Sequence, residues 1–110
     1  MPNVKIYVDD TLYPQLRPAI AALLPDLRAL LCRDFGVDIP ACQFGVIGVM
    51  GLPDQPPINA ELSILPRPDR TREAVLSVAE SLRAMIGVAT GQRVAIRIST
   101  LDAAGYVALK

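Results

Sequence analysis

The first ten residues, MPNVKIYVDD, place a proline directly behind the initiator methionine and directly ahead of a strand-like run. Chain ends and turns tolerate proline, which is one explanation for Pro2. The second explanation is chemical, because removal of Met1 would leave the Pro2 nitrogen as a free secondary amine that can accept a proton. Pro2 is therefore a candidate for either a structural or a catalytic residue.

Arginine is the second residue type in this chain that could contribute to a functional site. Nine of the eleven basic residues are arginine, and there is no histidine. The guanidinium group is planar and permanently charged and can hold a carboxylate through two parallel hydrogen bonds, whereas lysine is the commoner solubilising charge. The bias therefore predicts a small acidic ligand, although a genome rich in arginine codons explains it equally well.

The remaining composition argues against several classes of partner. Eleven basic residues balance eleven acidic ones, which gives no electrostatic reason to expect nucleic acid or an anionic membrane as a partner. Cys32 and Cys42 have neither the spacing of a zinc site nor that of a CxxC redox motif, so we expect buried thiols in a reducing cytosol, no metal and no cofactor. The N-terminus does not look like a signal peptide, and no apolar run reaches the roughly 20 residues of a membrane span. We expect a soluble cytoplasmic protein.

The first half of the chain has the pattern of a strand, a helix and a second strand. Residues 3–8 alternate between apolar and polar, which predicts a half-buried strand. Leucine and isoleucine at helical spacing then predict a helix that ends at Gly36. Pro25 is expected to kink this helix or split it in two. The apolar run 42–52 predicts the second strand, bulged or closely approached at its glycines.

The second half repeats this pattern after the loop PDQPP at 53–57. Residues 58–65 alternate and predict a strand, and an apolar stripe after residue 71 predicts a helix that stops at Gly87. RVAIRIS at 93–99 predicts the last strand, which is followed by a short tail.

The order β-α-β, loop, β-α-β predicts an α/β (α+β) fold with a four-stranded mixed sheet. We expect one domain over residues 1–110, with halves of about 2–52 and 58–110, and right-handed crossovers that place both helices on one face. A domain this small gains from burying the other sheet face against copies of itself, so a homo-oligomer is expected. A ferredoxin-like binding domain shares this order with different connectivity; it would make Pro2 incidental, and a monomer in solution would favour it.

Several short stretches, taken together with Pro2, resemble the tautomerase superfamily. RVAIRISTLDAAGYV (93–107) looks like the corresponding stretch of the macrophage migration inhibitory factor group, and ALLPDL and VALK look like the 5-(carboxymethyl)-2-hydroxymuconate isomerase group. ILPRPDRTREAV (64–75) is similar to the strand-to-helix turn of the 4-oxalocrotonate tautomerase group. The resemblance implies an isomerase that uses a mature N-terminal proline as general base to interconvert the enol and keto forms of a small 2-oxo acid.

The resemblance also implies roles for five residues. Pro2 would be the catalytic base, and Arg97, Arg67, Arg70 and Tyr106 would bind a carboxylate substrate or line its pocket. An apolar pocket and nearby arginines would disfavour the cation and so lower the pKa of the amine from its usual value of about 7.7–8.0. In this family the pocket lies between the subunits of a trimer, so some of these arginines would serve the Pro2 of a neighbour.

The chain departs from the family pattern at three pocket positions. The hydroxymuconate isomerase has an arginine where this chain has Gln43. Macrophage migration inhibitory factor has a lysine where this chain has Val37 and a tyrosine where it has Ala95. We therefore expect a different substrate, and hydratase or dehalogenase variants of the chemistry stay open. The alternative is a non-catalytic trimer of the same fold that acts as a ligand-binding or structural module. Retention of Met1 would favour this alternative, because the Pro2 nitrogen would then be an amide.

Overall fold

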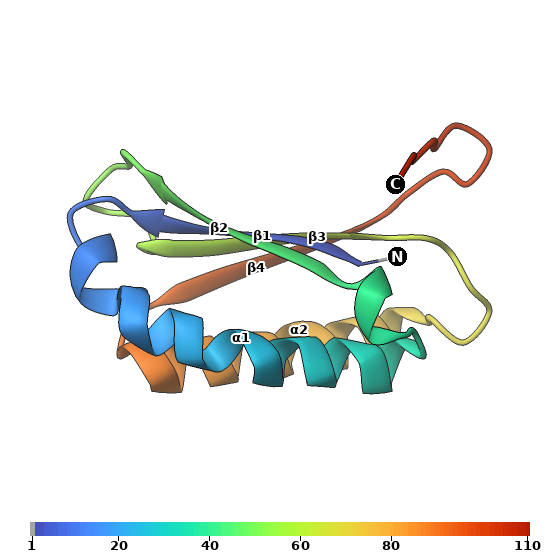
Figure 1. Ribbon diagram of the computed structural model, residues 1–110, viewed down its shortest axis with the longest axis horizontal. Helices are drawn as coiled ribbons and strands as arrows, with labels where there is room; N and C mark the ends of the chain where they lie inside the picture. The colour runs from blue at the N-terminus through green and yellow to red at the C-terminus, as the bar shows by residue number, and fades with distance from the viewer. Residues whose placement is uncertain (1) are drawn as a thin grey trace.

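The computed structural model describes residues 2–110, and Met1 lies outside the described residues. Strands and helices follow one another in the predicted order β-α-β-β-α-β (Figure 1). The assignment of residues 1–110 to one domain stays a prediction. The elements are β1 (Asn3–Asp9), α1 (Tyr13–Phe35), a 3-10 turn η1 (Ile39–Ala41), β2 (Gln43–Val49), β3 (Ile58–Ile64), α2 (Arg72–Thr90) and β4 (Val94–Thr100).

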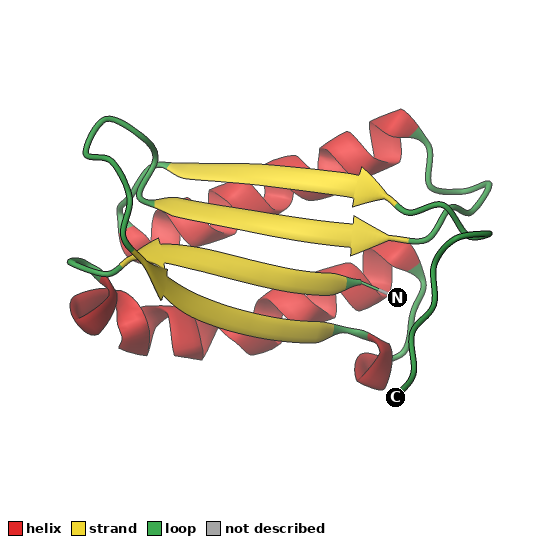
Figure 2. Ribbon diagram, turned by 90° about the horizontal axis from the view of Figure 1, so that it is seen from above, coloured by secondary structure: helices red, strands yellow, loops and turns green. Residues whose placement is uncertain are grey.

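The four strands form one mixed sheet in the order β2-β1-β3-β4. β1 pairs in parallel with β2, β3 pairs in parallel with β4, and the two halves meet through the antiparallel pair β1–β3. Both helices cover one face of the sheet, and the described residues leave the opposite face uncovered (Figures 1 and 2). The predicted fold class is confirmed.

The core lies between the sheet and the two helices. Alternate residues of β1 and β3 point into it, so the side chains of Val4, Ile6 and Val8 are at most 2% exposed. The helices contribute a buried stripe each, because their apolar residues recur at helical spacing. Those stripes consist of Ile20, Leu27, Leu30, Leu31 and Phe35 from α1 and Val78, Leu82 and Ile86 from α2.

Helix α1 runs unbroken through Pro18 and Pro25, so of the two outcomes expected at Pro25, a kink or a split, the split does not occur. A proline inside a helix costs about 3 kcal/mol, largely because it removes one backbone hydrogen bond and crowds the preceding turn. Five buried apolar side chains of α1 each contribute roughly 1.5–3 kcal/mol, which outweighs that cost. Pro25 also lies on the exposed side of the helix. Water can therefore reach the backbone carbonyl one turn earlier, which has no N–H partner because proline supplies none. Among residues 2–110, no helix is both long and apolar enough to cross a membrane.

Helix α2 extends past Gly87, so the expected stop at this residue is also wrong. A glycine within a helix costs only about 1 kcal/mol relative to alanine, which is too little to end a helix that is packed on a sheet. The helix ends at Gly91, which has a φ of 67° and adopts the left-handed conformation of a C-cap. At the other end the Thr71 side chain accepts the backbone N–H of Ala74 at 3.2 Å.

Candidate active site

Pro2 lies immediately ahead of β1, one of the two central strands of the sheet. Its side chain is less than 2% exposed. The backbone N–H of Gln43, the first residue of β2, donates to the Pro2 carbonyl oxygen at 3.1 Å. The parallel pairing of β1 with β2 therefore fixes the backbone at Pro2.

A pocket of about 370 Å³ opens beside Pro2. Its walls come from the first residues of β1 and β2 and from the segment after β4, which folds back toward the start of the chain (Figures 1 and 2). This volume lies in the range of small-molecule sites. Within residues 2–110, no three or more histidine, cysteine or acidic residues are grouped so as to hold a metal ion. The residues that line the pocket are Pro2, Asn3, Gln43, Tyr106, Ala108, Leu109 and Lys110.

Strand directions explain why the end of the chain reaches Pro2. β3 is antiparallel to β1, and β4 is parallel to β3. The chain therefore leaves β4 at the same end of the sheet at which β1 begins. The structure thus brings two of the five predicted site residues, Pro2 and Tyr106, to one pocket. Tyr106 is 37% exposed, so its side chain is open to a ligand.

Arg97 lies on the uncovered face of the sheet, away from the Pro2 pocket of its own chain. It belongs to β4, which is separated from β1 by β3. Arg97 is an exposed residue, and its Nη1 donates to Oδ1 of Asn59 on β3 at 2.7 Å. Within one chain, Arg97 and Pro2 therefore do not meet.

Arg67 and Arg70 lie in the loop before α2, where their guanidinium groups contact backbone carbonyls. Arg70 donates to the carbonyl oxygens of Leu65 at 2.6 Å and of Phe35 at 3.0 Å. Arg67 donates to the carbonyl oxygens of Phe35 and Gly36, both at 3.3 Å. The last carbonyls of α1 have no helical partner, so the two arginines satisfy the end of that helix.

Arg70 is the more deeply set of these two arginines. Its guanidinium carbon lies 5.3 Å from the centre of the Phe35 ring, a cation–π distance. Burial and the neighbouring charge of Arg67 lower the pKa of Arg70. Neither arginine lines the Pro2 pocket in this chain, and their assignment to substrate binding stays a prediction.

Sequence reasoning did not single out Asn3 or Lys110, and it noted Gln43 only for its departure from the family pattern. The parallel pairing of the first two strands could have indicated Gln43, because it places residues 2 and 43 at the same end of the sheet. Lys5 also lies close, since its Nζ donates to Oδ1 of Asn3 at 2.8 Å. The polar side chains that line the pocket are thus two amides, a phenol and one lysine, and Lys5 contacts one of the amides.

Comparison with protein-family models finds no match, and comparison with curated protein sequences finds none either. Solved structures do match. The chain is similar to a wild-type fused 4-OT that forms an asymmetric trimer, with a TM-score of 0.76 and 11% identity over 96% of this chain and 91% of that one. It is similar to N1, a member of the cis-3-chloroacrylic acid dehalogenase family, with a TM-score of 0.71 and 13% identity over 96% and 79% of the two chains. A Vibrio cholerae protein of unknown function has a TM-score of 0.75 and 14% identity over 97% and 83%.

These similarities concern the fold. The fused 4-OT and N1 share the fold of this chain over nearly its whole length. The fold that the resemblance implies is therefore confirmed.

Proposed function

We propose that this protein is a tautomerase or isomerase that interconverts the enol and keto forms of a small 2-oxo acid, with Pro2 as the general base. The observation that carries the proposal is the position of Pro2, which lines a pocket of about 370 Å³ at the head of a central strand. Tyr106 across the same pocket supports it, because a phenol can donate a hydrogen bond to an enol or carbonyl oxygen.

The chemistry requires a single proton acceptor. Once Met1 is removed, the lone pair of the Pro2 nitrogen accepts a proton from the carbon atom beside the substrate carbonyl. The electrons of the broken C–H bond form the enolate, and the protonated amine returns the proton to oxygen to give the enol. The reverse sequence gives the keto acid. Tyr106 is proposed to stabilise the negative charge on the enolate oxygen.

The proposal extends to a homotrimer, in which the uncovered sheet faces and chain ends meet. Ile47 on that face is 39% exposed, and Val107 and Leu109 on the segment after β4 are 81% and 94% exposed. Exposed apolar side chains on this face and on the segment after β4 support burial against a partner. A neighbouring copy can then bring its Arg97 to the Pro2 pocket, which a single chain does not do.

Sedimentation velocity checks this assembly. We expect one species with the mass of three chains, because burial of the uncovered face stabilises a domain this small. Ile47→Lys is expected to shift the protein toward the monomer, since it places a charge in the interface. Val88→Lys is the matched control, because Val88 lies 87% exposed on α2, away from the sheet face. A monodisperse wild-type monomer would contradict the proposal that the pocket is shared between subunits.

Arg97→Ala tests the proposed carboxylate contact. We expect KM for acidic substrates to rise about tenfold or more, because a hydrogen bond to a charged group contributes roughly 1.5–3 kcal/mol. Neutral analogues should show a much smaller change. Arg93→Ala, which removes an equal charge from the residue directly before β4, is the control. An equal change in KM for acidic and neutral compounds would mean that Arg97 is structural.

The experiment that tests the proposal as a whole joins intact mass to an activity assay. We expect protein purified from its host to lack Met1 and to convert phenylenolpyruvate or 2-hydroxymuconate between enol and keto forms. Protein that retains Met1 in every molecule would carry an amide at Pro2 and would contradict the mechanism. The alternative of a non-catalytic ligand-binding or structural trimer would then account for the fold.

A further inference from the structure

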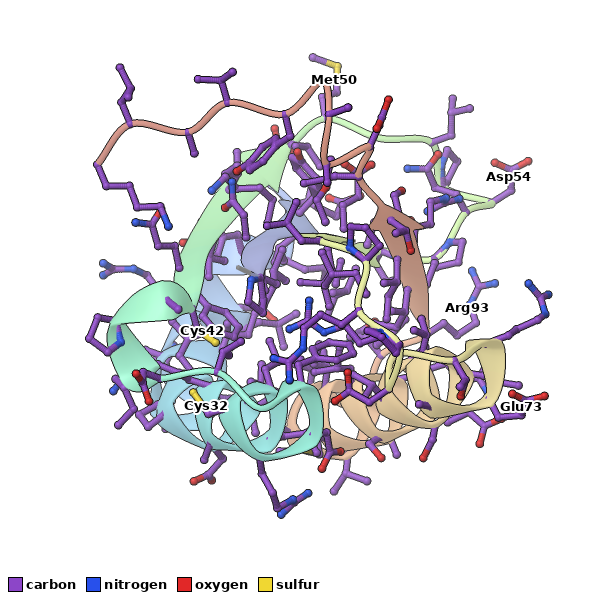
Figure 3. The ribbon with its side chains drawn as sticks, turned by 90° about the vertical axis from the view of Figure 1, so that its right-hand side faces the viewer. Cys32, Cys42, Met50, Asp54, Glu73 and Arg93 are labelled. Atoms are coloured by element: carbon purple, nitrogen blue, oxygen red, sulfur yellow. The ribbon has the colours of Figure 1, made fainter. Side chains whose placement is uncertain are left out.

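The two cysteines, ten residues apart in the sequence, lie side by side in the fold. Cys32 belongs to the last turn of α1, and Cys42 directly precedes β2. Their sulfur atoms are 3.6 Å apart and face one another (Figure 3). Both are free thiols.

The backbone holds this pair in place from both sides. The N–H of Val37 donates to the carbonyl oxygen of Cys32 at 3.1 Å, which closes the end of α1. The N–H of Cys42 donates to the carbonyl oxygen of Ile39 at 3.1 Å, which closes the 3-10 turn η1. The short connection is therefore hydrogen-bonded at both cysteines, which holds their backbones in the positions that bring the two sulfur atoms together.

We propose that Cys32 and Cys42 form a reversible dithiol–disulfide site that is oxidised by low-molecular-weight disulfides of the glutathione class. The inference goes beyond the proposed function and does not depend on it, because it concerns a reaction of the thiols alone.

The surroundings of the two sulfur atoms assign different roles to them. Cys32 is half-buried, whereas Cys42 is 7% exposed. Burial and the neighbouring Cys32 thiol raise the pKa of Cys42 to about 11, so few Cys42 thiolates exist at neutral pH. A thiolate is the attacking species in disulfide exchange. Cys32 is therefore the entry point, and Cys42 resolves the intermediate.

The exchange balances in two steps. The Cys32 thiolate attacks one sulfur of the small disulfide, whose S–S bond breaks, and one reduced small thiol leaves with the proton. Cys42 then loses its proton and attacks the Cys32 sulfur of the mixed disulfide, forming the Cys32–Cys42 bond and releasing the second small thiol. Two electrons and two protons pass from the protein to the small disulfide.

A groove lined by Cys42 lies next to the pair of sulfur atoms. It has a volume of about 330 Å³ and lies between α1 and β2. Arg28 lines it next to Cys42, and its positive charge acts to lower the pKa of that thiol. The same charge attracts the carboxylates of a glutathione-type molecule. The groove offers space for that molecule while it is joined to Cys32, whose sulfur lies 3.6 Å from that of Cys42.

The test uses the full chain, reduced and then equilibrated with mixtures of oxidised and reduced glutathione. We expect the intact mass to fall by about 2 Da, the two hydrogen atoms lost in a two-electron oxidation, and alkylation to find no free thiols. Dithiothreitol should restore both thiols. The fraction oxidised should not change with protein concentration, because the bond forms within one chain.

Two serine variants separate the roles of the cysteines. Cys42→Ser is expected to stop at a glutathione adduct on Cys32, because the resolving thiol is missing. Cys32→Ser should form its adduct at least about tenfold more slowly, since Cys42 is buried and mostly protonated.

The wild-type result decides the proposal even if a variant fails to fold. Two free thiols at oxidising ratios, a lasting glutathione adduct on the wild type, or disulfides only between chains would each overturn it. These measurements do not depend on tautomerase activity. The disulfide can therefore be tested whether or not the proposed function is correct.

Discussion

Pro2→Ala is expected to lower kcat/KM for enol–keto conversion of phenylenolpyruvate about tenfold or more. A positioned general base contributes roughly 10²–10⁴-fold to such a reaction, and an alanine at the chain end retains a primary amine that can supply part of it. Alanine also leaves a gap, because the Pro2 ring is less than 2% exposed. Circular dichroism and urea unfolding should therefore accompany the kinetics, so that a loss of base is distinguished from a loss of fold.

The form of the protein that still carries Met1 is the matched control for this variant. It keeps the Pro2 ring, but it turns the nitrogen into an amide without a basic lone pair. We expect it to lose at least as much activity as Pro2→Ala while its circular dichroism spectrum stays the same. Equal activity of the Met1-bearing and processed forms would show that the nitrogen is not the base, whatever Pro2→Ala does.

The elements of this fold were predictable where one side of a strand or helix is apolar. Residues 3–8 alternate, and the strand formed there buries Val4, Ile6 and Val8 as the alternation requires. The helix ends were less predictable. Whether Pro25 breaks a helix depends on how much apolar surface the helix buries against the sheet and the other helix, and that quantity is a tertiary one.

The candidate site was predictable in part, for a topological reason. The antiparallel pairing of β1 with β3 carries the end of the chain back to its beginning, which is how Tyr106 and Pro2 come to line one pocket. The arginines were harder to place. A charged side chain in a loop pairs with whatever acceptor lies nearest, and Arg67 and Arg70 both donate to the carbonyl of Phe35 at the end of α1, more than thirty residues earlier. No local pattern in the sequence marks such a partner.

The same limit applies to the cysteine pair. A spacing of ten residues matches no redox motif, and the separation of 3.6 Å arises because α1 ends at Gly36 and the chain reverses through η1 before β2. Gly36 has a φ of 64°, a conformation that favours glycine, so a residue without a side chain determines where two thiols meet.

The positions of the arginines lead to the second large effect that we expect. Arg70→Ala should lower the free energy of unfolding by about 2–4 kcal/mol, because it removes two charge-assisted hydrogen bonds and a cation–π contact. The carbonyl oxygens of Phe35 and Leu65 lose the donors that Arg70 supplies. The Nε of Arg70 is buried and has no hydrogen-bond partner among residues 2–110, and release of this group offsets part of the loss. Urea unfolding followed by circular dichroism measures the change.

Two further variants make this prediction specific. Arg72→Ala removes the same charge from an exposed residue two positions later, and it should change stability by no more than about 0.5 kcal/mol. Arg70→Lys should recover only part of the loss, since one ammonium group on a flexible stem does not reproduce the planar fork that reaches two carbonyls at once. If Arg70→Ala unfolds like the wild type and instead raises KM for acidic substrates, the helix-end contacts carry little energy. Arg70 would then be the carboxylate ligand that its place before α2 suggests.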